Sequence, residues 1–466
     1  MTGNWFPRIE TARLVAFLIV VKAVLFAILL PPWQGPDEPT RMEPVVIISK
    51  ARELIPPMTP DPDYQLKAIQ SMRNHHAWDH YERQVPDLSV KTFNGANLPA
   101  GASSLYETPW VYLPAGLAAR WMAARTVEGK LYSARFSMLI IHLLATLVVG
   151  WISGFVFRGA DWKLPRVSVV LMYGLHPQLS FLAASVHPDN LGFLTSSLVI
   201  GLVLFAAHKN ELGASSRLWK LTLSGALVLG GFSGYLIRKQ LILIPFLVTS
   251  VPLLFWPQLH RRSRVEAISK SVLIAIVIAF AFAVVLYHHP EWVGWRLHGY
   301  PQLGGIDELT GVSFGSWMRY LSVIFVTFWL ALGSLVSKFG FGWLTFLFCA
   351  FASVLFGWVM YSLRRRMTHV TLTGVNRRAM AILGIWMGWV WLSMLIAYGP
   401  HVQNAEGRYL LGALPAIVCV WVGGWLFAVP CKNLSASAIV WAAAILLLNA
   451  VTLFQYLIPS YYLSHL

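Results

Sequence analysis

The first residues that could do chemistry follow the first long apolar run. The chain reads Pro-Pro-Trp-Gln-Gly-Pro-Asp-Glu-Pro-Thr-Arg from residue 31 to residue 41, so Asp37 and Glu38 stand side by side among prolines. Carboxylates are the hard oxygen donors that divalent cations prefer, and partial burial raises their pKa toward the range of a general base. The pair therefore suits either a general base or a ligand for Mg²⁺ or Mn²⁺. The alternative is a solvated loop in which an acid caps a helix.

A third acid, Asp189, lies in another short polar stretch, Ser-Val-His-Pro-Asp-Asn, at residues 185–190. It precedes an apolar run, so its structural alternative is again a helix cap. Charged side chains near a bilayer are costly and are usually retained for function. If both stretches lie at one membrane surface, Asp37, Glu38 and Asp189 form a candidate site that could also hold the metal ion.

Basic residues stand at several predicted helix ends where membrane topology does not require them. They are Arg135, the pair Arg238 and Lys239, and Arg408. Arg binds phosphate through a planar fork of donors, and Lys binds it as a point charge. A ring of such residues at one leaflet would suit a pyrophosphate or phosphodiester head group. The alternative for each residue is snorkelling of the side chain from a helix end.

Lys22 is different because it falls near the middle of the first apolar run. A charge at that depth is expensive and usually faces a partner or a cavity. The sequence identifies no partner for it.

The elements that must position these residues follow from composition. Apolar residues make up 57% of the 466 residues, charged residues 12%, and the mean hydropathy is +0.60. Soluble proteins are about 25% charged, so the sequence predicts an all-α polytopic membrane protein. This composition excludes collagen-like and disordered proteins. A disulfide scaffold is also excluded, because three cysteines form no disulfide framework. The sequence contains no H-E-x-x-H zinc motif, P-loop or nucleophile elbow.

About 20 apolar residues are needed for a helix to cross the hydrocarbon. Runs of suitable length lie near residues 14–30, 136–157, 167–184, 191–207, 221–237, 240–257, 271–287, 342–363, 379–398, 409–428 and 437–458. Lys and Arg in short loops mark the cytoplasmic side. They cluster at the N-terminus and near residues 158–166, 209–220, 261–270 and 364–378.

The apolar stretch at 318–336 is ambiguous, because a full crossing there would place residues 364–378 outside. We expect it to be interfacial or re-entrant on the outer side, which leaves about eleven spans. The N-terminus is then cytoplasmic and the C-terminus external. Most of the net charge of +16 is then explained by Lys and Arg in cytoplasmic loops. We therefore expect no nucleic-acid partner.

This topology divides the chain into five parts. Residues 1–30 hold the first span, and residues 31–130 form an external loop with amphipathic helices expected at 41–54 and 109–125. The remaining parts are helices two to seven at 131–287, a second external segment at 288–341, and the C-terminal helices at 342–466. Aromatic residues of the first loop, such as Trp33 and Tyr112, need a core to pack against.

The order of these motifs resembles a known pattern. The stretches are Pro-Pro-x-Gln-x-Pro-Asp37-Glu38-Pro, His187-Pro-Asp189 and Gly407-Arg408-Tyr409-Leu-x-x-x-x-Pro415, with looser matches at 106–112 and 327–343. Together they resemble the GT-C superfamily of integral-membrane glycosyltransferases. They are most similar to an uncharacterised bacterial membrane-protein family with a Pro-Asp-Glu motif in the first external loop.

The resemblance implies a GT-C-like helix bundle in the bacterial inner membrane. Members of that superfamily transfer a sugar from a polyprenyl-phosphate carrier to a glycan or lipid acceptor at the external, periplasmic face. The first-loop acid corresponds to Asp37, which would act as the base or hold a metal with Glu38. Asp189 corresponds to a second external acid. The carrier phosphate would bind basic and polar residues of these motifs and helix ends, namely Arg41, Arg135, Arg238, Lys239, Arg408 and Tyr409.

The chain departs from the aminoarabinose-transferring branch, which carries Lys-Pro-Pro in the first loop where this chain has Thr108-Pro109-Trp110. Two other functions stay open. A transporter or flippase for lipid-linked sugars would line a path with charged groups. An assembly protein could keep the fold without catalysis.

Overall fold

The computed structural model describes residues 9–77, 105, 109–122, 124–158, 163–211, 376–398, 407–428 and 434–459, with isolated positions between 222 and 328 and at 462. Every regular element in these ranges is helical, which confirms the all-α prediction. The helices of the N-terminal half are α1 (Ile9–Leu29), α2 (Glu38–Lys50), α3 (Pro62–Asn74), η3 (Pro109–Val111), α4 (Leu113–Trp121), α5 (Val127–Val156), α6 (Lys163–Gly174), α7 (Pro177–Ala183) and α8 (Asp189–Glu211). Those of the C-terminal part are α15 (Arg377–Tyr398), η9 (Gly407–Ala413), α16 (Leu414–Ala428), α17 (Leu434–Val451) and η11 (Thr452–Leu457).

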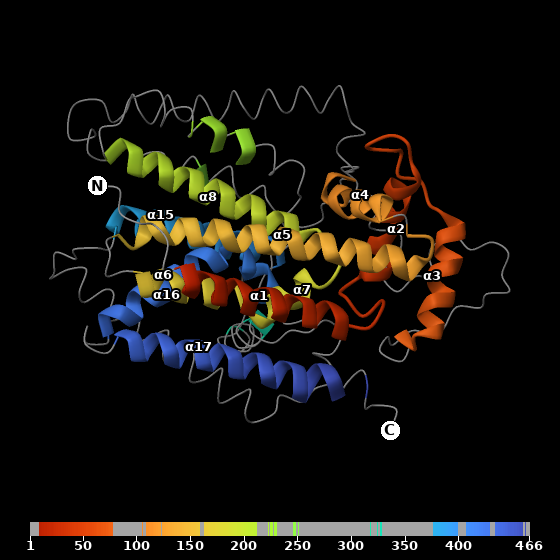
Figure 1. The fold of residues 1–466 in the computed structure, drawn as a ribbon. Coiled ribbons are helices and arrows are strands. Elements are labelled where there is room, and N and C mark those ends of the chain that lie inside the picture. The colour runs from red at the N-terminus through yellow and green to blue at the C-terminus, as the bar shows by residue number, and fades with distance from the viewer. Residues whose placement is uncertain are drawn as a thin grey trace.

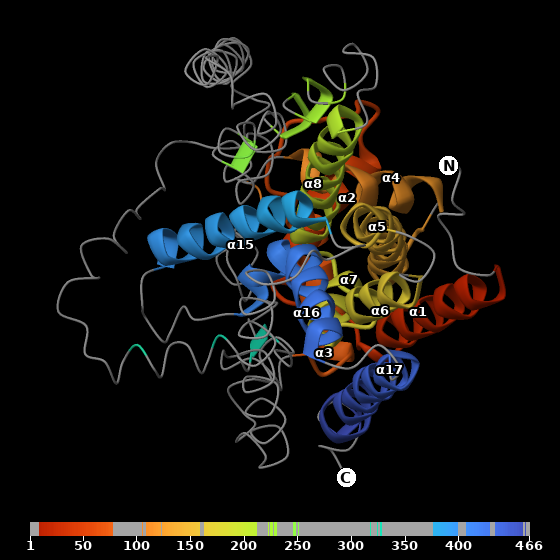
Figure 2. The ribbon, with the colours of Figure 1, turned by 90° about the vertical axis from the view of Figure 1, so that its left-hand side faces the viewer.

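The helix α5 is the central element of the described fold. It packs against α8, α6 and α1 along its length and against α4 near its start. Figure 1 shows α1, α5, α8 and α17 running along the bundle, with α2, α3 and α4 gathered at one end. Figure 2 views the bundle from the opposite end, with α15 and α16 in front. The bundle is therefore capped at that end by the segment predicted as the first external loop.

Helix length and composition agree with a membrane location. Among the described residues, Val127–Val156 and Asp189–Lys209 are long and apolar enough to cross a bilayer, with mean hydropathies of 2.2 and 1.9. Shorter apolar helices are Arg378–Leu392, Leu410–Gly423 and Ala442–Phe454. The predicted spans near 271–287 and 342–363, and most of 318–336, lie outside the described residues. The number of about eleven spans stays a prediction.

The cap has an apolar core of its own. Trp33, Tyr64 and Tyr112 are fully buried there with Met42 and Ile48. Aromatic side chains bury large areas and dominate the energetics of such cores. Trp33, Tyr64 and Tyr112 thus have the packing partners that the sequence required, whereas Trp121 at the end of α4 is 84% exposed. A separate core in the bundle involves α5, α6, α8, α15 and α16.

The helix expected at 41–54 differs from its prediction. It begins at Glu38 and ends at Lys50, and most of its side chains are buried, including Arg41 and Glu43. The reason is that α2 packs against α4, α3 and α5 rather than lying on a lipid surface. Gly116 of α4 allows this, because a Cβ there would lie 2.4 Å from Cγ2 of Ile48.

A second difference concerns the span predicted at 167–184. The structure breaks it, since α6 ends at Gly174 and α7 begins at Pro177. Proline lacks a backbone N–H and disfavours helical geometry in the residue before it. His176 occupies the break, and its Nδ1 accepts a hydrogen bond from the backbone N of Leu179 at 3.4 Å. The break places the turn after α7 at the same end of the bundle as α2.

Burial of Glu43 makes the stability of the cap depend on pH. Its Oε1 accepts hydrogen bonds from the Asp61 backbone N–H at 2.9 Å and from Gln65 Nε2 at 2.7 Å. Burial is the main cause that raises the pKa of Glu43, against the opposing effect of these bonds. Because the pKa of Glu43 is raised in the folded state, its contribution to the free energy of unfolding is fully present at pH values below the ordinary glutamate pKa. That contribution is lost as the pH rises through the raised pKa of the folded protein.

Glu43→Gln removes the ionisable group and keeps a side-chain oxygen as the acceptor. We therefore expect this variant to gain thermal stability relative to the native protein as the pH rises from 4 to 7. Thermal unfolding followed by circular dichroism at several pH values measures this difference. Glu53→Gln, at an exposed position of the same cap, is the control and should show no such trend. A stability difference for Glu43→Gln that stays constant with pH would contradict the prediction.

Candidate functional site

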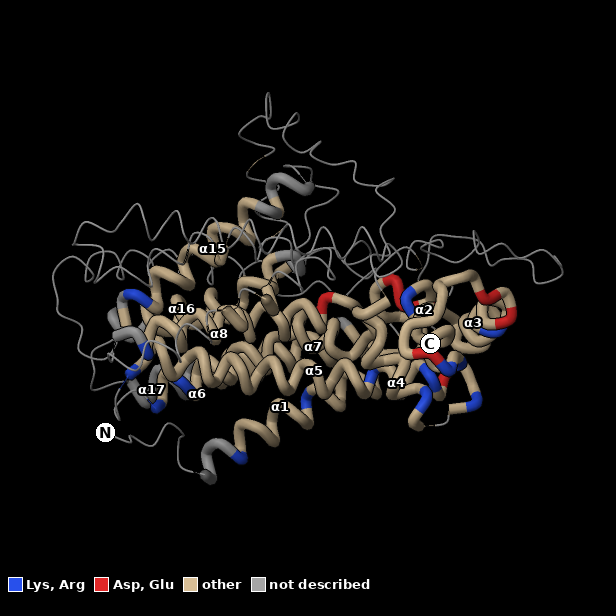
Figure 3. The backbone as a smooth tube through the Cα atoms, turned by 90° about the horizontal axis from the view of Figure 1, so that it is seen from above, with Lys and Arg blue, Asp and Glu red and all other residues tan. Residues whose placement is uncertain are grey.

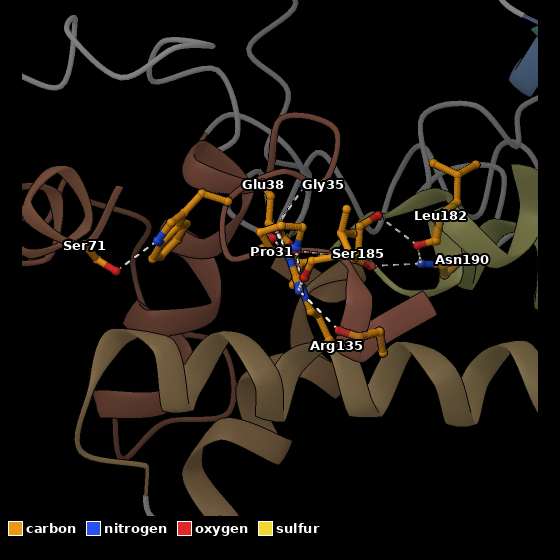
Figure 4. Close-up of polar contacts among 12 residues, drawn as sticks. Pro31, Gly35, Glu38, Ser71, Arg135, Leu182, Ser185 and Asn190 are labelled. Atoms are coloured by element: carbon orange, nitrogen blue, oxygen red, sulfur yellow. Dashed lines mark hydrogen bonds and ion pairs between the residues drawn. The ribbon is translucent and has the colours of Figure 1, made fainter. Parts of the chain in front are cut away.

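The centre of the candidate site is a buried ion pair between Glu38 of α2 and Arg135 of α5. Nε of Arg135 donates to Oε1 of Glu38 at 2.8 Å, and Nη2 donates to Oε2 at 2.6 Å. Both side chains are almost completely buried. This paired, two-bond geometry is the strongest form of the Arg–carboxylate interaction. Figure 4 shows Arg135 rising from its helix toward Glu38 and Pro31.

The pair joins four segments of the chain. Arg135 also donates to the carbonyl oxygens of Leu30 at 2.6 Å and Pro31 at 2.9 Å. These carbonyls follow the last turn of α1, where backbone acceptors have no partner within the helix. The carboxylate of Glu38 accepts from the backbone N–H groups of Gly35 at 3.2 Å and Val186 at 3.3 Å. The end of α1, the first-loop motif, α5 and the turn before α8 are therefore held together.

These contacts bear on the roles predicted for Glu38 and Arg135, which stay predictions. Both oxygens of Glu38 accept hydrogen bonds from Arg135 and from backbone N–H groups. Arg135 lies in the third turn of α5, not at a helix end, and its donors are directed to Glu38 and the α1 carbonyls. The pair joins the segments that carry the candidate site.

The same geometry bears on the predicted metal site. Within the described part of the chain, no group of three or more His, Cys, Asp or Glu side chains could hold a metal ion. Asp37, Glu38 and Asp189 form no such group there, and the carboxylate of Glu38 is engaged by Arg135. The described residues do not form a three-carboxylate site for Mg²⁺ or Mn²⁺.

Asp37 occupies a different environment from its neighbour. Its side chain is 43% exposed, and its Oδ2 accepts from Nη2 of Arg41 at 3.0 Å. The backbone of Asp37 is left-handed, with φ of 54°, and that of buried Trp33 is also positive, with φ of 72°. Such conformations are uncommon for residues other than glycine and gather at functional sites. Asp37 is thus a half-exposed carboxylate on a constrained loop, with Arg41 beside it.

The loop is anchored on its other side by α3. The indole Nε1 of Trp33 donates to Oγ of Ser71 at 2.9 Å, and that hydroxyl bonds to Glu128 at the start of α5. The amide of Gln34 reaches the carbonyl of Ala77 at 3.3 Å. The segment from Trp33 to Asp37 is therefore held by contacts on both sides. A carboxylate that acts in catalysis requires such preorganisation.

Asp189 begins α8 and forms a close pair with His187. Nδ1 of the imidazole lies 3.5 Å from Oδ2 of Asp189 and accepts from the Asp189 backbone N–H at 3.2 Å. His187 is fully buried, and Asp189 is nearly so. Sequence reasoning named His187 only as part of a motif and gave it no role. The signal that could have identified it is the spacing of His and Asp around Pro188.

The remaining predicted residues are placed only by their backbone or lie outside the described residues. The segment η9, which carries Arg408 and Tyr409, packs against α7 and α8. The third sequence motif therefore lies against the helices on either side of the His-Pro-Asp turn. The side chains of Arg408 and Tyr409, and residues Arg238 and Lys239 as a whole, fall outside what the structure describes.

The chain matches one known protein family. A family described as "Predicted membrane protein (DUF2142)" matches residues 19–418. The chain belongs to this family. The matched region of the DUF2142 member contains Asp37, the Glu38–Arg135 pair, His187 with Asp189, and Arg408.

The chain was also compared with curated proteins and with solved structures. Comparison with curated proteins gives no match. Among solved structures, this DUF2142 chain is similar to the crystal structure of ArnT from Cupriavidus metallidurans in the apo state. The TM-score is 0.46 at 15% sequence identity, over 96% of this chain and 73% of that chain.

The approach of the first loop to the turn before α8 depends on Gly35. A Cβ at this position would lie 2.6 Å from Cβ of Ser185 and 2.9 Å from Cδ of Glu38. We expect Gly35→Ala to push the loop off the turn and to lower the free energy of unfolding by about 1–3 kcal/mol, as overpacking does. Thermal unfolding of the purified protein measures the loss.

The matched control is Gly388→Ala in α15, where nothing lies within 4 Å of an added Cβ. Alanine in an open helical position should be neutral or slightly stabilising. Equal behaviour of the two variants would show that loop and turn are not in close contact.

Proposed function

We propose that this protein is a GT-C-like glycosyltransferase that moves a sugar from a polyprenyl-phosphate carrier to a glycan or lipid acceptor in the cell envelope. The resemblance of three sequence motifs motivates the proposal. The observation that carries it is the contact between two of those motifs, through the hydrogen bond from the Val186 N–H to Glu38. Strained Asp37 and the His187–Asp189 pair flank that contact.

In the proposed reaction the acceptor hydroxyl oxygen bonds to the anomeric carbon of the sugar. The bond between that carbon and the carrier phosphate oxygen breaks, and the phosphate leaves with the electron pair. Asp37 takes the proton of the hydroxyl, since a carboxylate held close to the acceptor is a suitable general base. Arg41 orients Asp37 before the reaction, through the hydrogen bond at 3.0 Å.

The departing phosphate needs cations. With Arg135 committed to Glu38, we assign this role to Arg408 with Tyr409, and to Arg238 and Lys239. Arg41, beside Asp37, is assigned to the same phosphate site. Asp189, which begins α8 beside His187, is the second acid and orients the sugar or the acceptor.

We further propose an inner-membrane location with the site on the periplasmic face, the N-terminus in the cytoplasm and the C-terminus outside. The distribution of charge supports this orientation (Figure 3). Acidic residues accompany basic ones at the end that carries α2 and α3. Among the coloured residues, the opposite end shows only Lys and Arg, and Arg158, Lys163 and Lys209 stand at helix ends there. A basic end of this kind faces the cytoplasm.

The direct test incubates the purified protein in nanodiscs with a panel of undecaprenyl-phosphate sugars and a pool of envelope glycans and lipids, with and without EDTA. Release of undecaprenyl phosphate together with a glycosylated acceptor is the expected result. Transbilayer movement of an intact lipid-linked sugar without bond cleavage would favour the flippase alternative. Neither cleavage nor movement with any donor would favour the non-catalytic assembly role.

A further inference from the structure

The cap carries two exposed apolar side chains at the end of α4. Trp121 is 84% exposed and Met122 is 59% exposed, whereas Ala115 and Ala119 of the same helix are buried. Arg125, in the connection from α4 to α5, is also exposed. An indole in water forgoes the large area that aromatic side chains normally bury. Trp121 and Met122, together called the α4 tip, therefore form a surface that a partner should cover.

The exposed side chains of α5 indicate which partner this is. They follow one another at intervals of three or four residues, which places them on one face of the helix. They are Tyr132, Phe136, Ile140, Leu144 and Leu147. Because α5 is long and apolar enough to cross a bilayer, this face lies against lipid. Tyr132, at the cap end of the stripe, adds a hydroxyl to its ring, and tyrosines of this kind are enriched where a span leaves the hydrocarbon.

A second exposed stripe runs along α1 and ends in the same way. Its members are apolar and comprise Leu14, Phe17, Val20, Val21, Val24, Leu25 and Ile28. At the end of this helix the hydroxyl of Tyr462 donates to the carbonyl oxygen of Leu29 at 3.1 Å, and Tyr462 is 47% exposed. Two helices that pack against each other therefore both change from exposed apolar side chains to an exposed tyrosine at the cap end.

The two tyrosines place the edge of the hydrocarbon at the level of the Glu38–Arg135 pair. Cζ of Arg135 lies 5.4 Å from the centroid of the Tyr132 ring. The carbonyl that Tyr462 binds belongs to the end of α1, where Arg135 also binds carbonyl oxygens. The buried pair and the two exposed tyrosines thus share one level of the bundle.

The α4 tip lies close to this level. Residues 122–126 connect it to the start of α5, and Tyr132 is five residues further, roughly 8 Å along the helix. We propose that Trp121 and Met122 insert into the bilayer leaflet on the cap side and anchor the cap there. The amphipathic ring of tryptophan favours the membrane interface. Arg125 can extend its charged end to the lipid phosphates while its stem stays near the apolar region.

The anchor is connected to the segment that holds Asp37. Nη2 of Arg120, next to the α4 tip, donates to the carbonyl oxygens of Ile48 and, at 3.3 Å, of Glu53. Gly116 adds the close approach of α4 to α2. Insertion therefore fixes the position of α2, and with it Asp37, relative to the lipid head groups. The benefit of this position for a lipid-linked donor rests on the proposed function, whereas the insertion itself does not.

The test measures the depth of spin labels in the full-length protein, with Cys349, Cys419 and Cys431 replaced by alanine. Trp121→Cys and Met122→Cys are labelled separately and placed in nanodiscs of phosphatidylethanolamine and phosphatidylglycerol. The relative rates of collision with oxygen and with a water-soluble nickel complex give the depth of each label. We expect both labels to lie about 5–10 Å inside the head-group boundary, the depth of the apolar face of an interfacial helix.

The matched control is Asp63→Cys, an exposed position of α3, the helix that Figure 1 shows at the far end of the cap. Its label should lie in water. Helix content and size exclusion check folding, and the two tip positions are measured independently so that one misfolded variant does not decide the result. Labels at 121 and 122 that meet the nickel complex as often as the label at 63 would overturn the proposal and leave the tip to a protein partner. Because no sugar donor is present, inserted labels beside a failed transfer assay would retain the anchor and reject the glycosyltransferase.

Discussion

Asp37→Asn should lower the rate of sugar transfer by about 10²–10⁴-fold, the range that a general base contributes. The amide cannot accept the proton of the acceptor hydroxyl at neutral pH. The fold should survive, because Asn tolerates the left-handed backbone found at this position. The lost ion pair with Arg41 is partly exposed, and such pairs contribute about 0–1 kcal/mol.

The measurement is single-turnover transfer by purified protein with the donor identified in the panel. Asp63→Asn is the matched control, because Asp63 is an exposed acid of the same cap paired with Lys67. Its rate should equal that of the native protein. Unchanged turnover in folded Asp37→Asn would remove Asp37 from the mechanism.

Arg135→Met should lower the free energy of unfolding by about 3–5 kcal/mol, the effect of leaving one member of a buried ion pair alone. The variant strands the carboxylate of Glu38 in an apolar interior. It also removes the donors to the carbonyls of Leu30 and Pro31 at the end of α1. Substitution of an exposed residue, Arg73→Met on α3, is the control for loss of one positive charge.

The double variant Glu38→Gln/Arg135→Met tests the cause of this loss. Glutamine removes the stranded charge and keeps an oxygen for the N–H groups of Gly35 and Val186. We expect the double variant to regain a large part of the stability that the single variant loses. Thermal unfolding in detergent compares the proteins. A double variant no more stable than Arg135→Met would show that packing, not the buried charge, is responsible.

Local sequence was enough to predict much of the fold. The low charge content and the long apolar runs predicted a helical membrane protein, because helix formation and insertion depend on residues near one another along the chain. The central helix was expected at 136–157 and is found at Val127–Val156. Its first turns contain Glu128 and Arg135, which lowered the apolar signal although the helix continues through them.

The sequence also determined which polar stretches matter as candidates. Asp37, His187-Pro-Asp189 and the Arg408 stretch were identified from residue types and order alone. The break before Pro177 had a local signal in proline itself, but the run of apolar residues around it concealed the end of α6.

The tertiary structure decided how those residues are used. Glu38 and Arg135 are 97 residues apart in the chain, and no local pattern indicates that one neutralises the other. Adjacent acids looked equivalent in sequence, yet Glu38 is buried against Arg135 while Asp37 stays half exposed beside Arg41. The physical reason is that burial and pairing depend on which helices meet, and contacts between distant segments set the charge and availability of a side chain.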